Sequence, residues 1–328
     1  MAQSDALRQA IAALLQIGGV SQKQVATEAG VGQARLSQFL AGKYTGDNDS
    51  IARALERWLS QRERKSEQAK TLPDAPAFVF TPTANRVFDA LTYAQLAGDI
   101  AVVYGGAGVG KTITSNHYAA QENNVWVATL TPSSRTVSGV LEEISIAVGV
   151  KNPSQRAVSA RRDIVERIRN TGGLLIIDEA QHANIDALDE IRSLYDAGGD
   201  IVNHYIDGCG IKRVGQNGVG IALVGNEAVY GRMTGGNRAA YLDRLFSRIG
   251  KRTKVAKVLK SDVESLAAAW GIADSATIDL LVAIGNKPGA LRGVTKTLRL
   301  ASMFAAGAGA PLNATHVKAA YADLGGAE

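Results

Sequence analysis

The stretch VVYGGAGVGKTITS, residues 102–115, decides the fold. An apolar run typical of a buried strand breaks into four glycines and a Lys-Thr pair, and a helix-like segment, TITSNHYAAQ, follows. The spacing fits G-x-x-x-x-G-K-[ST], in the strand, loop and helix order that this motif requires. Glycines let backbone N–H groups converge on phosphate oxygens, and the start of a helix favours negative charge. The stretch therefore predicts a phosphate-binding loop.

The loop supplies most of the predicted nucleotide contacts. Lys111 is expected to neutralise charge on the outer phosphates of ATP, and the hydroxyl of Thr112 is expected to lie on a Mg²⁺ ion. The residues predicted to bind the nucleotide here are Gly105, Gly106, Ala107, Gly108, Val109, Gly110, Lys111, Thr112 and Ile113.

A second motif, LLIIDEA at 174–180, is an apolar strand that ends in two carboxylates. Asp178 is predicted to hold the hydrated Mg²⁺ and to contact the nucleotide site, and Glu179 to polarise the attacking water. The alternative is that the acidic pair caps the start of the next helix. Together with the phosphate-binding loop, the pair indicates hydrolysis of ATP rather than phosphate transfer to a substrate hydroxyl.

The chain divides by composition. Short apolar runs without a polar face (IAVVYG, VWVATL, LLIIDEA, GIALVGN) alternate with helical segments, which is typical of a doubly wound parallel α/β sheet. The predicted order is an all-α helix-turn-helix domain at 1–66, a linker at 67–77, the α/β domain at 78–253 and a helical lid at 254–328.

The N-terminal segment SQKQVATEAGVGQARLSQFLAGK reads as a helix-turn-helix. Ser21 and Gln24 are expected to form a capping box, and Gly30 to occupy the turn. Gln33 and Arg35 would face outward from the second helix, as side chains that can reach bases or phosphates of DNA. A helical bundle that serves protein contacts remains the alternative.

Charge indicates a polyanionic partner. The chain carries a formal net charge of +5, and residues 244–260 hold seven Lys or Arg and no acid. Binding to the phosphate backbone needs clustered cations, and the low aromatic content of 5% disfavours stacking on single strands. A solvated basic face is the alternative. The candidate contacts to double-stranded DNA are Lys151, Arg156, Arg161 and Arg162.

Composition also excludes several classes of protein. One cysteine, Cys209, allows no internal disulfide framework, and four scattered histidines offer no zinc spacing. The sequence holds no apolar stretch near 20 residues and no secretory leader pattern, so we expect a cytosolic protein with no membrane association.

The two motifs, the strand ending in LVGN, the arginines of DRLFSRI and PGALR in a helical lid resemble the AAA+ ATPase pattern. The resemblance implies that Asn226 positions the water and that Arg292 contacts the nucleotide from the lid. It also implies that an arginine of one subunit, Arg248 or Arg244, reaches the nucleotide of its neighbour. Such an arginine is worth roughly 10³ to 10⁵ in turnover, so hydrolysis would depend on assembly.

Over nearly the whole chain, the sequence resembles the transposition protein B family of phage Mu and its prophages. The segments that carry the likeness are NNVWVATLTPS, MTGGNR, RLFSRIGKRT and KPGALR. The resemblance implies an ATPase that polymerises as a helical filament on duplex DNA without sequence specificity. It would deliver that DNA to a transposase in the cytoplasm of a bacterial host, stimulate strand transfer, and be released when the transposase provokes hydrolysis.

One segment departs from that family pattern. Residues 196–219 form a Gly- and Asn-rich connection that is predicted to be a surface hairpin or loop. Three other functions stay open: a transcription regulator that senses ATP, a replication initiator or helicase loader, and a catalytically idle scaffold. The intact Lys111, Thr112, Asp178 and Glu179 disfavour the last.

Overall fold

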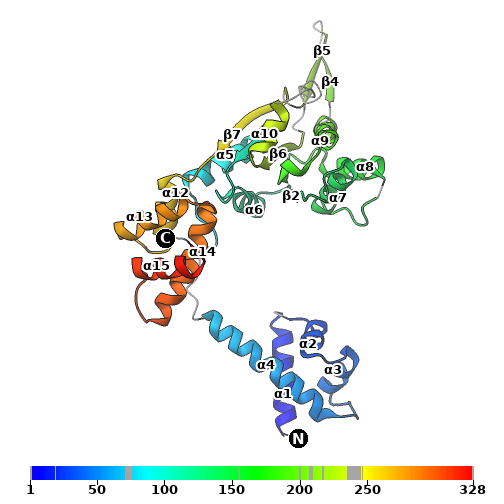
Figure 1. The fold of residues 1–328 in the computed structure, drawn as a ribbon. Coiled ribbons are helices and arrows are strands. Elements are labelled where there is room, and N and C mark those ends of the chain that lie inside the picture. The colour runs from blue at the N-terminus through cyan, green and yellow to red at the C-terminus, as the bar shows by residue number, and fades with distance from the viewer. Residues whose placement is uncertain are drawn as a thin grey trace. The chain divides into compact units, whose positions relative to one another are not determined.

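The computed structural model describes residues 2–18, 20–70, 76–154, 156–198, 201–206, 210–215, 218–234, 245 and 247–326. These divide into two compact units, Met1–Asp74 and Ala75–Glu328. Figure 1 shows the order of the helices and strands along the chain.

The first unit is helical. It contains α1 (Ala2–Gln16), α2 (Gln22–Ala29), α3 (Gln33–Leu40) and α4 (Asn48–Lys70). Ile11, Leu36, Phe39 and Leu55 are fully buried between these helices. The indole N–H of Trp58 donates to Glu28 at 2.7 Å and ties α4 to α2.

Helices α2 and α3, which follow one another around Gly30, occupy the segment where the sequence predicts a helix-turn-helix, and that assignment stays a prediction. Ser21 Oγ accepts from the backbone N–H of Gln24 at 3.2 Å, and Gly30 ends α2 in the left-handed conformation. The reciprocal hydrogen bond, from the Ser21 N–H to the Gln24 side-chain oxygen, is not formed at this described helix start, and the Gln24 amide NH₂ donates to Glu28 at 2.8 Å. Helix α4 continues to Lys70, so the first four residues of the predicted linker, 67–70, are helical, and the linker boundaries stay a prediction.

The second unit is built on a five-stranded parallel sheet in the order β2-β3-β6-β1-β7. The strands are β1 (Ile100–Gly105), β2 (Val125–Thr129), β3 (Leu174–Asp178), β6 (Gly220–Gly225) and β7 (Ile249–Val255). The four apolar runs expected to be strands are confirmed. The sequence pattern missed β7, because an edge strand alternates buried and exposed residues and carries charge.

Helices cover both faces of the sheet, as expected for a doubly wound fold. Ala101 and Val103 point to the face covered by α5 (Pro82–Ala97) and α6 (Lys111–Gln121). Ile100 and Val102 point to the face covered by three other helices. These are α7 (Val137–Ala147), α8 (Ala157–Ile168) and α9 (Ile185–Gly198). Each strand therefore contributes to two apolar cores.

The inserted connection contains a hairpin, as predicted. Strand β4 (Ile201–Ile206) pairs antiparallel with β5 (Gly210–Gly215), with Ile201 opposite Gly215 and Ile206 opposite Gly210. The two strands form a sheet of their own, separate from the parallel sheet. The chain then returns to the parallel sheet through β6, and α10 (Glu227–Thr234) follows.

The C-terminal part is all helical: α12 (Lys260–Ala269), α13 (Ser275–Gly285), α14 (Ala290–Gly307) and α15 (Ala314–Asp323). It has its own core, which includes Leu281, Val294 and Val317. It shares one compact unit with the sheet, so the boundary at 253/254 stays a prediction. Within the described part of the chain, no helix is long and apolar enough to cross a membrane.

A buried carboxylate joins the lid to the α/β core. Asp262 in α12 is 0% exposed and accepts from the Thr83 N–H at 2.8 Å and from the Thr83 hydroxyl at 2.7 Å. It also accepts from the Leu259 N–H at 2.9 Å. One side chain thus fixes the start of α5 and the start of α12 together.

We expect Asp262→Ala to lower the free energy of unfolding by about 3 kcal/mol, because it leaves buried N–H groups without acceptors. Glu264→Ala, on an exposed part of the same helix, should cost less than about 1 kcal/mol. Urea denaturation followed by circular dichroism measures both. Equal losses for the two variants would contradict this role for Asp262.

Candidate active site

Three strand ends bring the predicted catalytic residues to one edge of the sheet. β6 lies between β1 and β3 and runs parallel to both, so the carboxyl ends of all three strands meet. The glycine-rich loop follows β1, Asp178 ends β3, and Asn226 follows β6. Residues 121 positions apart in sequence, Gly105 and Asn226, therefore share one site.

The glycine-rich loop is held between β7 and the lid. The N–H of Gly106 donates to Val255 O at 3.1 Å, and the N–H of Arg292 donates to Gly108 O at 3.2 Å. Gly108 has φ 75°, and a Cβ added to it would overlap the carbonyl group of Gly289. Only glycine allows this approach. The contact brings Arg292, whose side chain is exposed, from the lid to the loop.

The side chain of Lys111, the first residue of α6, makes hydrogen bonds to the backbone of the loop. Its ammonium donates to Gly105 O at 3.1 Å and to Gly106 O at 2.6 Å. Burial lowers the pKa of Lys111, the charges of Glu179 and Asp178 oppose that shift, and the charge of Arg292 adds to it. The two cations and two carboxylates that the sequence assigns to the site therefore act on one another electrostatically.

Asp178 fits a role in holding Mg²⁺. It is 1% exposed, its Oδ1 accepts from the Glu179 N–H at 2.9 Å, and its Oδ2 is buried without a hydrogen-bond partner. Burial raises the pKa of the Asp178 carboxyl, whereas the nearby Thr112 side chain and the Glu179 backbone N–H act to lower it. An unpaired buried carboxylate oxygen next to a threonine hydroxyl matches the oxygen ligands that Mg²⁺ takes.

The described residues contain no group of three or more His, Cys, Asp or Glu side chains that could cage a metal ion. A Mg²⁺ ion usually keeps several waters and binds through one or two carboxylates plus substrate phosphates. The residues therefore fit a metal that arrives with the nucleotide rather than one held by protein alone.

Glu179 lies in a strained turn. Its φ of 53° is in the left-handed region, where a residue with a side chain is uncommon. The turn continues as a short 3₁₀ helix, Ala180–His182. The carboxylate of Glu179 accepts a hydrogen bond from Nε2 of Gln181, a residue that the sequence analysis did not select. Its signal was its place two residues after Glu179.

Asn226 lies at the site, but its side chain also has a structural partner. Its Oδ1 accepts from the Ala228 N–H at 2.8 Å, which caps the start of α10. Its backbone N–H donates to Gln181 Oε1 at 3.2 Å. Its role in positioning water stays a prediction.

Arg248 lies away from the phosphate-binding loop of its own chain. It precedes β7, which runs parallel to β1, while the loop follows the opposite end of β1. A strand of this length spans about 20 Å. Arg248 Nε pairs with Asp196 Oδ1 at 2.7 Å, and both side chains are partly exposed. The other candidate, Arg244, lies outside the described residues.

The candidate DNA contacts differ in surroundings. Lys151, Arg156 and Arg162 are exposed. Arg161 instead forms an ion pair with Glu190 at 3.1 Å and donates to Ser193 Oγ at 3.0 Å, so it joins α8 to α9.

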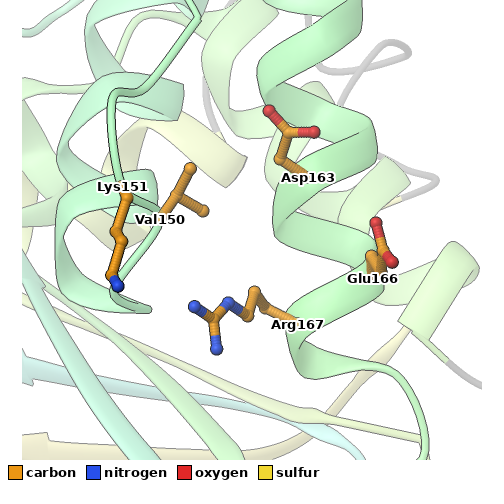
Figure 2. Close-up of a pocket in the computed structure, with 5 residues that line it drawn as sticks. All are labelled: Val150, Lys151, Asp163, Glu166 and Arg167. Carbon is orange, nitrogen blue, oxygen red and sulfur yellow. The ribbon is translucent and has the colours of Figure 1, made fainter.

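Lys151 lines a surface hollow together with Val150, Asp163, Glu166 and Arg167. Figure 2 shows Arg167 extending from α8 toward the segment that carries Lys151, with Asp163 and Glu166 along the same helix. Two cations and two carboxylates therefore leave this hollow without a net charge. In the first unit, Gln33 and Arg35 are exposed on α3. The DNA assignments all stay predictions.

The fold and this site define a P-loop nucleotide-binding protein of the AAA class. A family model described as an AAA domain matches residues 96–233, and one described as "Mu B transposition protein, C terminal" matches residues 247–324.

Full-length relatives agree with these family models. The chain is 38% identical over 302 residues to the ATP-dependent target DNA activator B of Escherichia phage Mu, covering 92% of this chain and 89% of that protein. It is 35% identical over 280 residues to the Mu-like prophage FluMu DNA transposition protein B of Haemophilus influenzae, covering 85% and 90%. The chain belongs to the Mu B transposition protein family.

A solved structure of Drosophila ORC bound to DNA is also similar. It has a TM-score of 0.49 and 14% identity, and the match covers 76% of this chain and 63% of that chain.

We expect Asp178→Asn to raise the melting temperature when nucleotide and divalent cations are removed with EDTA. The folded-state pKa of Asp178 lies above its unfolded value near 3.9. In the pH window between these two pKa values, the folded protein therefore binds more protons than the unfolded chain. The free energy of unfolding therefore falls as pH rises through the window. Removing the charge should stabilise by on the order of 1 kcal/mol at neutral pH.

The stabilisation should disappear well below about pH 3.9, where Asp178 is protonated in both the folded and the unfolded state. Asp323→Asn, on the exposed end of α15, provides the matched control and should not change the melting temperature at either pH. A loss of stability in Asp178→Asn at neutral pH would count against the assignment of a buried, destabilising charge.

Proposed function

We propose that this protein is a Mg²⁺-dependent ATPase that polymerises on duplex DNA, without sequence preference, and presents that DNA to a transposase as its target. The observation that carries the proposal is the meeting of the glycine-rich loop, the Asp178–Glu179 pair and the lid arginine at one edge of the sheet. The name of the phage Mu relative, ATP-dependent target DNA activator B, supports the DNA part of the proposal. The proposed place of action is the cytoplasm of a bacterial host.

Each side chain of the site has its own role in ATP hydrolysis. Lys111 and Arg292 bind the phosphates from the loop and from the lid, and Asp178 and Thr112 would hold Mg²⁺. When bound, Mg²⁺ neutralises charge that develops on the phosphate oxygens. Glu179 orients the attacking water and accepts its proton, and Asn226 holds that water from the end of β6.

The distance between Arg248 and the loop of its own chain supports a role in trans. Arg248 lies about one strand length from its own loop, so it can act on a nucleotide only in a neighbouring subunit. In a single chain it pairs with Asp196. Assembly on DNA would exchange that partner for the terminal phosphate of the neighbour, so that DNA binding and hydrolysis depend on each other.

The proposed DNA surface consists of exposed cations that can reach phosphates. Arg156 and Arg162 are the stronger candidates of the α8 segment, because Arg161 has partners on α9 and Lys151 lines a hollow that also contains two carboxylates. Contacts to the backbone alone carry no sequence information, which suits a protein that must accept any target. Gln33 and Arg35 on α3 are the proposed contacts of the first unit.

Fluorescence anisotropy with labelled duplexes tests the proposal. With ATP and Mg²⁺, random-sequence duplexes of different composition should bind with affinities within a factor of a few of one another, and ADP should abolish most of the binding. Affinity should fall steeply with salt, as expected of phosphate contacts. A strong preference for one sequence would instead favour an ATP-sensing transcription regulator that reads its operator through α3.

Mixing two inactive variants tests the trans arginine. Arg248→Ala should lose about 10³-fold in DNA-stimulated ATP hydrolysis, and Lys111→Ala should lose ATP binding. Mixed together, they should recover part of the rate, because a Lys111→Ala subunit can still supply Arg248 to an Arg248→Ala neighbour. Phosphate release measured at a series of mixing ratios checks this. A mixture no more active than the sum of its parts would rule out Arg248 as the trans residue.

Two adjacent arginines give a matched test of the DNA surface. Arg162→Ala should weaken DNA binding and reduce the salt slope by about one, with stability changed by less than about 0.5 kcal/mol. Arg161→Ala should cost about 1 kcal/mol of stability through loss of Glu190 and Ser193, with the salt slope unchanged. The opposite pattern would make Arg161 the DNA contact.

A further inference from the structure

The side chain of Gln181 connects the ends of two strands at the site. Its Nε2 donates to Glu179 Oε2, and its Oε1 accepts from the backbone N–H of Asn226 at 3.2 Å. Glu179 follows β3 and Asn226 follows β6. We propose that Gln181 is a positioning residue that sets the Glu179 carboxylate and couples it to the end of β6. This inference rests on the proposed function in one respect, namely that Glu179 acts on the water.

The orientation of the Gln181 amide is fixed by its two partners. A carboxylate can only accept hydrogen bonds and a backbone N–H can only donate them, so the NH₂ group must face Glu179 and the oxygen must face Asn226. Neither partner would accept the reversed amide. One oxygen of Glu179 is thereby engaged, which leaves Oε1 to accept from the water.

The surrounding backbone is shaped to hold this amide. A Cβ added to Gly225 would overlap Gln181 Oε1, so the glycine makes room for the side chain at the end of β6. On the other side, the N–H of His182 donates to Glu179 O at 2.9 Å and closes the 3₁₀ turn. The left-handed Glu179 belongs to the same turn. Strained residues of this kind persist where neighbouring structure holds them, and they concentrate at functional sites.

The bridge has a consequence for the reaction. Any shift of the backbone at Asn226 moves the acceptor side of the Gln181 amide and, through it, the carboxylate of Glu179. Nucleotide contacts made at the end of β6 would therefore reach Glu179 without direct contact. A displacement of about 1 Å at a catalytic group can cost about 10²-fold in rate.

Steady-state ATP hydrolysis by the full-length protein on random duplex DNA tests the inference. Gln181→Ala should lower kcat by about 10- to 100-fold, while the Kd of a fluorescent ATP analogue changes by less than about twofold. Gln181→Glu keeps the acceptor but places a second carboxylate beside Glu179, so its kcat should fall at least as far. Gln121→Ala, an exposed glutamine at the end of α6, is the matched control and should keep the wild-type kcat.

A double variant separates positioning from a general structural role. If Gln181 acts through Glu179, then Gln181→Ala added to Glu179→Gln should lower the residual rate by less than about twofold, because the group it positions is already lost. Full additivity of the two losses would overturn the inference, as would a wild-type kcat in Gln181→Ala or Gln181→Glu.

The failure of this inference is distinguishable from failure of the proposed function. A Glu179→Gln variant that hydrolyses ATP at the wild-type rate would remove the catalytic role of Glu179 and the proposed function with it. An inactive Glu179→Gln beside a fully active Gln181→Ala would overturn only the role of Gln181.

Discussion

The pairing of β6 between β1 and β3 is the constraint on which the site depends. Val103 of β1 is in register with Val224 of β6, and Ile177 of β3 is in register with Leu223. These pairings align the carboxyl ends of the strands, so that the phosphate-binding loop, the acidic pair and Asn226 meet at one edge. The buried cores on both faces hold the register, because the side chains of each strand pack closely against the helices that cover their own face.

Much of this arrangement could be predicted from the sequence because the signals are local. The glycine-rich loop and the Asp178–Glu179 pair each follow an apolar strand, and both lie where expected. Features that depend on tertiary contacts could not be read in this way. Strand β7 alternates charge with apolar residues, as a sheet edge does, and its pattern resembles a basic patch. The roles of Gln181 and Asp262 exist only once distant segments meet. Likewise, the sequence alone indicates that Arg161 is a surface cation. In the structure its partners, Glu190 and Ser193, lie on another helix.

The charges of the site and of the subunit surface fit a protein that works as an assembly. Lys111, Arg292 and the acidic pair lie at the carboxyl ends of the strands. Arg248 instead lies at the amino end of β7 and pairs with Asp196. A single chain thus holds every predicted part of the hydrolysis site except the trans arginine. In the proposed function, this division makes the lifetime of a DNA-bound assembly depend on hydrolysis, because the residue that completes each site comes from a neighbour. The lid takes part through Gly289 and Arg292, which contact the loop at Gly108.

Negative-stain electron microscopy of the protein on a random-sequence duplex, with ATP, with ADP and without nucleotide, tests this account most directly. We expect continuous helical filaments along the DNA with ATP, and bare DNA in the other two conditions. Discrete particles at fixed positions on the DNA, or filaments that form equally well with ADP, would contradict it.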